Sequence, residues 1–114
     1  MVELNEVMES YNEYVKNLPT GAEYISRCLR ENQLNEGLTA IKDFSEGVLW
    51  LSDASDLMKK NGAKVELNIG QIQEFLIEIN EGLEKQDYVL VADMFEYEIS
   101  PFFEEVELVK GQVQ

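Results

Sequence analysis

The stretch from Asp87 to Val109 has hydrophobic residues on two opposite faces of one predicted helix, and it contains no lysine or arginine. At 100° per residue, one stripe has the pattern of a helix face that packs on a core. Its members are Tyr88, Val91, Ala92, Phe95, Ile99, Phe102, Val106 and Val109. A second stripe lies opposite, formed by Leu90, Met94, Tyr97, Pro101 and Leu108. Because a small domain covers two faces of a helix less easily than one, we expect the second stripe either to be covered by another helix of the same chain or to contact a partner.

Acidic residues border this second stripe on both sides. They are Asp93, Glu96, Glu104 and Glu107 on one flank, and Asp87, Glu98 and Glu105 on the other. Apolar contact supplies affinity, and surrounding charge orients an approaching partner. The pattern therefore predicts a docking surface for a partner helix that carries lysine or arginine beside its apolar face.

The segment 34–60 shows the same two-sided pattern. Its core stripe consists of Leu34, Leu38, Ile41, Val48 and Leu49, and its opposite side carries Trp50, Ala54 and Leu57. Trp50 and Leu57 are candidates to extend the docking surface. Two lysines in the last turn and the pair Asn61-Gly62 favour an end of the helix at residue 60.

Two further segments, 3–17 and 69–85, have a single apolar stripe each. Pro19 predicts a stop or bend after the first, and Thr20 with Glu23 resembles a capping box for a short helix that reaches Glu31. Asn68 and Asp87 are expected to cap the helices that follow them. Pro101 lies inside the last predicted helix, where an apolar stripe that stays in phase indicates a kink.

The apolar pattern repeats weakly at an offset of 54 residues, so that the turn near Asn32 corresponds to the turn near Gln86. Each half then reads as a helical hairpin, a common way to build a bundle. We predict an all-α, up-and-down four-helix-type bundle with an additional N-terminal arm kinked at Pro19. Residues 1–114 would form one domain, with the helices 34–60 and 88–109 as its spine.

The charge of the chain narrows the classes of partner. Twenty-three acidic residues against nine basic ones give a formal net charge of -14. Such a surface repels nucleic acid and anionic lipid, so we expect neither as a direct partner. The chain has no apolar run long enough for a membrane span and no signal-peptide pattern, which favours a cytoplasmic location.

The composition also excludes much catalytic chemistry, because the chain contains no histidine. Serine–histidine and cysteine–histidine nucleophiles and most zinc sites need that residue. The single cysteine, Cys28, is expected to be buried and inert. Magnesium-dependent hydrolases of the MazG class use pairs of acids on adjacent helices; Glu78 and Glu81 fit the first pair, but Leu90 stands where the second needs an acid. We predict no catalytic residue, no cofactor and no metal site.

Two segments resemble a family of small, uncharacterised, acidic all-helical bacterial proteins. The run from Glu84 to Glu105, EKQDYVLVADMFEYEISPFFEE, is similar to the closing segment of that family, and residues 44–51, FSEGVLWL, are similar to its middle. The resemblance covers about the last two-thirds of the chain. It implies a bacterial, all-helical domain and no particular activity, ligand or site residue.

Together these patterns predict a non-enzymatic interaction module, such as a small adaptor, chaperone-like protein or regulatory subunit. Three alternatives stay open. The second stripe could close a homodimer, the carboxylates could mimic nucleic acid on a basic protein surface, or the chain could be a magnesium-dependent hydrolase.

Overall fold

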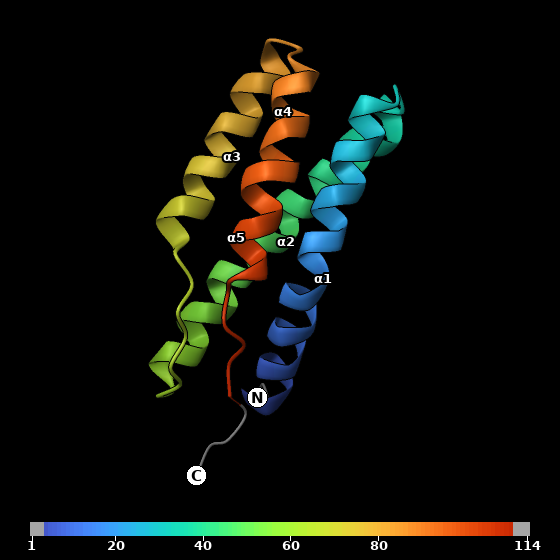
Figure 1. The fold of residues 1–114 in the computed structure, drawn as a ribbon. Coiled ribbons are helices and arrows are strands. Elements are labelled where there is room, and N and C mark those ends of the chain that lie inside the picture. Colours follow the sequence, from blue (N-terminus) through green and yellow to red (C-terminus); the bar gives the residue numbers. More distant parts are fainter. Residues whose placement is uncertain (1–3, 111–114) are drawn as a thin grey trace.

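A computed structural model of the chain describes residues 4–110. Within this range it contains four helices and no strand (Figure 1). They are α1 (Leu4–Arg30), α2 (Leu34–Lys60), α3 (Ile69–Glu84) and a last helix made of α4 (Tyr88–Met94), η1 (Phe95–Ile99) and α5 (Ser100–Glu104). The helices run alternately up and down, which confirms the predicted all-α bundle. Of the predicted domain, residues 1–3 and 111–114 lie outside the described range.

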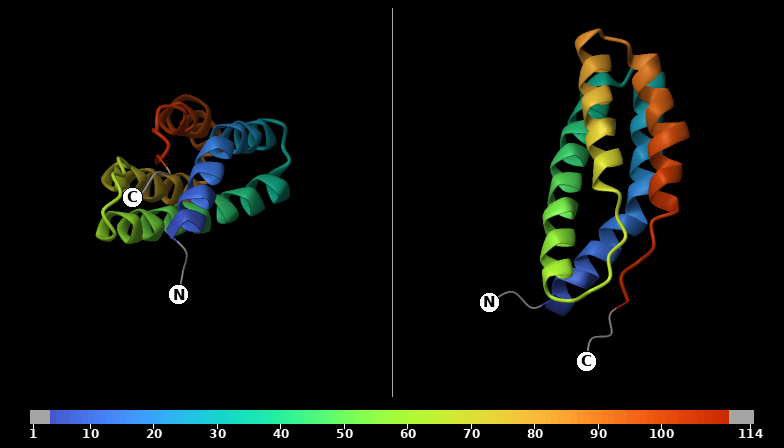
Figure 2. Two further views of the ribbon diagram at one scale, coloured as in Figure 1. Left: turned by 90° about the horizontal axis from the view of Figure 1, so that it is seen from below. Right: turned by 90° about the vertical axis from the view of Figure 1, so that its left-hand side faces the viewer.

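The first helix is continuous through Pro19, so of the predicted stop or bend the stop is wrong, and so is the capping box at Thr20. The reason is an uninterrupted stripe of buried residues spaced alternately three and four apart: Met8, Tyr11, Val15, Leu18, Ala22, Ile25 and Leu29. Burial of one large apolar side chain contributes about 1.5–3 kcal/mol, so the stripe outweighs the roughly 3 kcal/mol cost of a proline within a helix. The axis of α1 bends along its length without a break (Figure 2).

The central element of the bundle is α1, which packs along α2 and along all three parts of the last helix. In contrast, α2 and α3 have few contacts with each other. The N-terminal segment is therefore one of the four bundle helices, and its predicted role as an added arm is wrong. The predicted spine, formed by the helices 34–60 and 88–109 alone, is also wrong, because α1 packs against both of them.

The bounds of α2 agree with the prediction, and α3 ends one residue earlier than predicted. The side chain of Asn68 caps α3 by accepting a hydrogen bond from the Gln71 amide at 3.1 Å. Two residues predicted for the core stripe of α2 are exposed, Leu49 to 57% and Leu38 to 37%. They lie at the edge of the stripe, beyond the width that α1 covers.

Both predicted hairpins are present, and their turns share one backbone geometry. Asn32 and Gln86 have the left-handed φ values 60° and 55°. In each turn the following amide donates to a carbonyl five residues earlier, from Gln33 to Cys28 and from Asp87 to Gly82, both at 2.8 Å. These bonds are characteristic of a Schellman helix end. The weak repeat at an offset of 54 residues therefore corresponds to a structural repeat at the turns.

Phenylalanines from three helices meet inside the bundle. Phe44 of α2 lies edge-on to Phe95 and Phe103 of the last helix, with ring centroids 5.1 and 6.3 Å apart. Phe75 of α3 meets Phe102 at 5.4 Å in the same edge-on arrangement, which aromatic rings prefer. The inner faces of α2 and the last helix thus face each other across the core, and their outer faces point apart.

Two extended segments close the lower end of the bundle, where α1 and α2 reach beyond the other helices (Figure 1). Residues 63–68 bury Val65 and Leu67, and residues 106–110 bury Val109. The side-chain amide of Asn12 donates to the Val109 carbonyl and accepts from its amide, each at 2.8 Å. The last helix thus ends at Glu104, five residues before the predicted end.

Candidate partner-docking surface

The middle of the last helix is a π-helical turn, η1, directly before Pro101. A proline has no amide hydrogen, and in a regular helix its ring clashes with the carbonyl four residues earlier, here that of Tyr97. A widened turn relieves the clash: the Ser100 amide donates to the carbonyl of Phe95, five residues before it. Pro101 therefore widens the helix without ending it, as π turns in longer helices often do.

This turn changes which side chains face the core. A π turn holds one residue more than an α turn, so the side chains after it are rotated by about 100° from the regular pattern. Phe103 is 2% exposed and occupies the core in place of the predicted Phe102, which is half-buried. Met94 is also only 2% exposed, so its predicted place on the outer stripe is wrong.

The remaining predicted apolar residues do not form one surface. Leu90 and Tyr97 are exposed on the last helix, to 46% and 66%. Leu108 is exposed but belongs to the extended segment after that helix, so its predicted position on a helical stripe is wrong. Trp50 and Leu57 are exposed on α2, whose outer face points away from that of the last helix. We therefore define the outer face by Leu90, Tyr97 and Pro101 alone.

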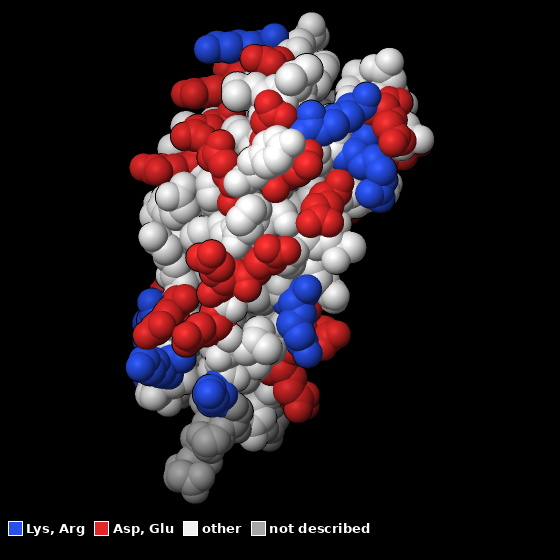
Figure 3. All heavy atoms as spheres, in the orientation of Figure 1, with Lys and Arg blue, Asp and Glu red and all other residues white. Residues whose placement is uncertain are grey.

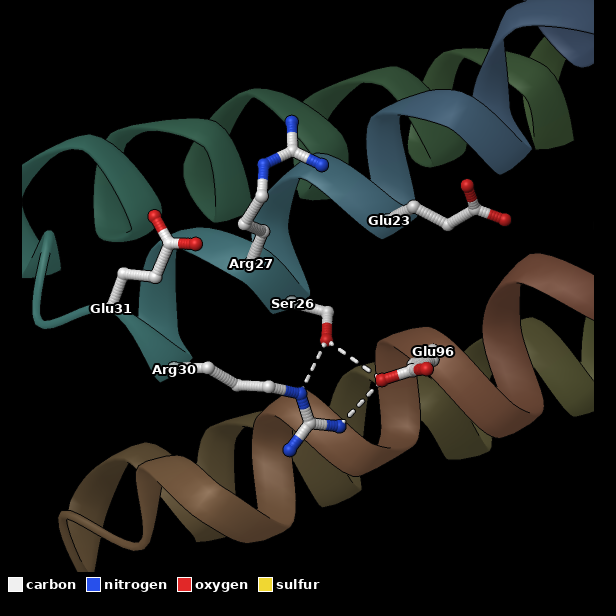
Figure 4. A pocket seen from close by; sticks show the side chains of 6 residues that line it. All are labelled: Glu23, Ser26, Arg27, Arg30, Glu31 and Glu96. Carbon is white, nitrogen blue, oxygen red and sulfur yellow. Dashed lines mark hydrogen bonds and ion pairs between the residues drawn. The ribbon is translucent and has the colours of Figure 1, made fainter.

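One acidic flank of this face is tied to α1 (Figure 4). The guanidinium of Arg30 donates to Asp93 at 2.9 Å and to Glu96 at 2.7 Å. The buried hydroxyl of Ser26 accepts from Arg30 at 3.2 Å and donates to Glu96 at 3.4 Å. The hydrogen bonds with Asp93 and Glu96 raise the pKa of Arg30 above its ordinary value. Both acids are thus paired within the chain, and they attach the end of α4 and the start of η1 to α1.

Three of the other predicted acids have no cationic partner among the described residues. Glu98, Glu104 and Glu105 are exposed, and in the part of the chain that the structure describes none of them forms an ion pair. Figure 3 shows acidic side chains spread over α3 and the last helix, with basic ones gathered toward the ends and over α1. The outer face is therefore bordered by unpaired negative charge.

The apolar and acidic patterns of the sequence do not predict two features of this region. Val89 is 68% exposed at the start of the last helix, although neither predicted stripe includes it. Arg30 lies 63 residues before Asp93, so its ion pair gives no local signal. The only hint was an arginine in the last turn of a predicted helix, which a favourable helix-dipole interaction already explains.

Metal binding, the cysteine and membrane-spanning helices can each be checked in the described residues. Between residues 4 and 110, no group of three or more Asp, Glu or Cys side chains is placed to hold a metal ion. Cys28 is buried, as predicted. Over the same range, no helix is both long and apolar enough to cross a membrane.

Comparison with known proteins places the chain in one family. No curated protein and no solved structure matches it. A family described as a domain of unknown function, DUF8042, matches residues 6–108, which include all four helices except the first residues of α1. This result confirms the predicted relationship to an uncharacterised family, and the chain belongs to the DUF8042 family.

Proposed function

We propose that this protein is a non-catalytic interaction module that holds a basic amphipathic helix of another protein against the outer face of its last helix. The observation that carries the proposal is the exposure of Leu90 and Tyr97, seven residues apart on one face. Tyrosine is among the residues that contribute most to binding at protein interfaces. Two turns of a partner helix would span this distance.

The charges beside these residues indicate the chemistry of the partner. Glu98, Glu104 and Glu105 lie at or after Tyr97 in the helix and its end, exposed and without ion pairs among residues 4–110. A partner helix with lysine or arginine along the edge of its apolar face would complement them. The formal charge of -14 would speed the encounter with such a partner at low salt.

The support behind the face favours binding without large rearrangement. The ion pairs of Arg30 with Asp93 and Glu96 attach the π turn to α1 beside Tyr97. The buried residues Phe95 and Ile99 fix the same turn from the core side. A surface held from two sides loses less conformational freedom when a partner binds.

The single cysteine agrees with a reducing compartment, and we propose a cytoplasmic location.

The test begins with a photoreactive phenylalanine analogue in place of Glu98, which would cross-link the partner in cells. The affinity of the purified pair is then compared for the variants L90S/Y97S and L49S/L57S. Both variants remove two exposed apolar side chains, but only the first alters the outer face. We expect L90S/Y97S to weaken binding by a factor of about ten or more and L49S/L57S to leave it unchanged. Equal affinities for wild type and L90S/Y97S would contradict the proposal.

The alternatives give different results with the same proteins. A nucleic-acid mimic would lose its partner at about 0.5 M salt and keep it in L90S/Y97S. A homodimer would show twice the monomer mass in light scattering, and the mass would fall in L90S/Y97S. A magnesium-dependent hydrolase would melt at a higher temperature in millimolar magnesium.

A further inference from the structure

A small pocket of about 190 Å³ opens between α1 and α2. Leu18, Ile25 and Phe44 form its apolar floor, and Tyr14, Tyr24 and Asp43 stand around it. At roughly 30 Å³ for a water-sized group, the volume holds about six such groups, which is the size of one aromatic ring. Most small-ligand sites combine an apolar lining with a few polar groups in the same way.

Gly21 lines the pocket, and its missing side chain leaves part of the space open. It lies in the interior of α1, where glycine is less favourable than alanine. A Cβ atom at this position would meet nothing within 4 Å, so no neighbouring element requires the glycine. By comparison, Gly47 of α2 gives space to the ring of Tyr14, which a Cβ atom would overlap. At Gly21 the missing side chain leaves open space instead.

Asp43 makes the rim of the pocket negative. Asp43 and Tyr14 line the pocket together. The burial of Tyr14, and then the charge of Asp43, raise the pKa of the Tyr14 phenol. Among the described residues Asp43 forms no ion pair. The shallow pocket beside it is lined by Asp43 and Glu36, so the negative region continues along α2.

The aromatic rings favour the same sign of ligand. The guanidinium of Arg27 already lies over one ring, 5.8 Å from the centroid of Tyr24. The faces of tyrosine rings carry partial negative charge and attract cations. Because Arg27 occupies that face of Tyr24, the ring of Tyr14, the apolar floor and the Asp43 carboxylate are the groups that suit a ligand with one hydrophobic ring and one cationic end.

We propose that this pocket binds an arylalkylammonium ligand, with its ring on Leu18, Ile25 and Phe44 and its ammonium group beside Asp43. The site lies between α1 and α2 and shares no residue with the outer face of the last helix. It is therefore independent of the proposed partner binding, and either proposal can fail without the other.

Titration of the ¹⁵N-labelled protein with phenethylamine tests the site, and 3-phenylpropionate serves as the probe of opposite charge. We expect saturable shifts of the amide signals of Gly21, Ala40 and Asp43, with a Kd on the order of 1 mM for a ligand of this size. The carboxylate probe should cause no saturable shift. Absence of saturable shifts with phenethylamine up to about 20 mM, or equal binding of both probes, would overturn the proposal.

Three variants, one of them a control, distinguish binding in the pocket from general attraction of a cation to an acidic protein. Gly21→Leu fills the open space with a good helix former, so it should abolish binding while the melting temperature stays at or above that of wild type. Asp43→Asn should weaken binding roughly three- to tenfold. Asp53→Asn removes an exposed acid of α2 outside the pocket and should change nothing. Full binding by Gly21→Leu, or equal losses in the two asparagine variants, would also overturn it.

Discussion

The two hairpins of the bundle share a turn but differ in the helices that the turn joins. Both turns lie at the same end of the molecule and contain one left-handed residue (Figure 1). Next to each turn the helices approach so closely that one of them needs a small residue. In the first hairpin Gly37 lies against Cys28, where an added Cβ atom would be 3.3 Å from that of the cysteine. In the second, Gly82 lies against Val91, with 2.7 Å between an added Cβ atom and a valine methyl.

These two pairs occupy equivalent positions, because 54 residues separate Cys28 from Gly82 and Gly37 from Val91. In the first hairpin the second helix carries the glycine, and in the second hairpin the first helix carries it. Both crossings therefore leave room for close approach, although different residues provide it. Close packing explains this, since the combined volume at a crossing matters more than which helix supplies it. It also explains why the repeat was weak in the sequence.

The hairpins diverge away from their turns. In the first, both helices have 27 residues. In the second, α3 has 16 residues and the last helix contains the π turn before Pro101. The first hairpin therefore acts as a regular frame, while the second presents Tyr97 from an irregular turn. Four measurements would test this contrast.

The largest effect is expected at the two phenylalanines after the π turn. Phe103→Ala should destabilise the fold by about 3–5 kcal/mol, because it empties a fully enclosed site, and Phe102→Ala by only about 2 kcal/mol. Urea unfolding of both variants measures the difference. A regular helix like α2 would give the opposite order, so that order would refute the π turn.

The crossing of the second hairpin should respond next. Gly82→Ala places a methyl group against Val91 and should cost about 1–2 kcal/mol after the gain in helix propensity. Val91→Ala makes room, so the double variant should be more stable than the sum of the two single effects by about 1 kcal/mol. Gly21→Ala, which meets no neighbour, is the matched control and should stabilise the fold. Additive effects at 82 and 91 would show that the two residues do not compete for space.

The two turns should differ in what they gain from glycine. Gln86→Gly relieves a left-handed conformation that glutamine adopts poorly, and should stabilise the fold by about 1 kcal/mol. Asn32→Gly should gain about half as much, because asparagine tolerates that conformation. Thermal unfolding of both variants makes the comparison. Equal gains would mean that the residue types do not distinguish the turns.

The smallest effect at neutral pH concerns Tyr11 of the first hairpin, whose buried hydroxyl has no hydrogen-bond partner within residues 4–110. Tyr11→Phe should leave stability unchanged or raise it by about 1 kcal/mol. Desolvation raises the pKa of Tyr11 from 10.0 to about 12, so its contribution is complete below pH 10 and is lost as the pH rises toward 12. The variant should lose less stability over that range. If the variant lost as much stability as the wild type over this pH range, the loss would come from other titrating groups.

Much of the fold could be predicted wherever the helices are regular. The bounds of α2, the caps Asn68 and Asp87 and the turn at Gly62 followed from local residue preferences. The continuity of α1 did not, because a proline signal is local whereas the stripe that overrides it runs over the whole helix. Its central position depends on contacts between helices, which periodicity does not show.

The candidate site was predicted less well, because it lies where the helix departs from 100° per residue. Leu90 and Tyr97 precede or coincide with the π turn and were placed correctly on the exposed side. Met94 was not, since the core near the turn is wider than one regular stripe. Asp93 and Glu96 form ion pairs with Arg30 and so are not unpaired at the surface. These contacts join distant segments of the chain, which no local pattern encodes.

The two hydrogen bonds between Asn12 and Val109 also make the Val109 amide a probe of local opening. The Val109 amide is hydrogen-bonded to a side chain of the first helix, outside the ladder of any helix. Its hydrogen exchange should therefore be slower than that of Leu108 and Lys110, and should speed up in Asn12→Ala while the exchange of α2 amides stays the same. The closing segment at residues 106–110 would then detach and return as a unit, at a free energy below that of global unfolding.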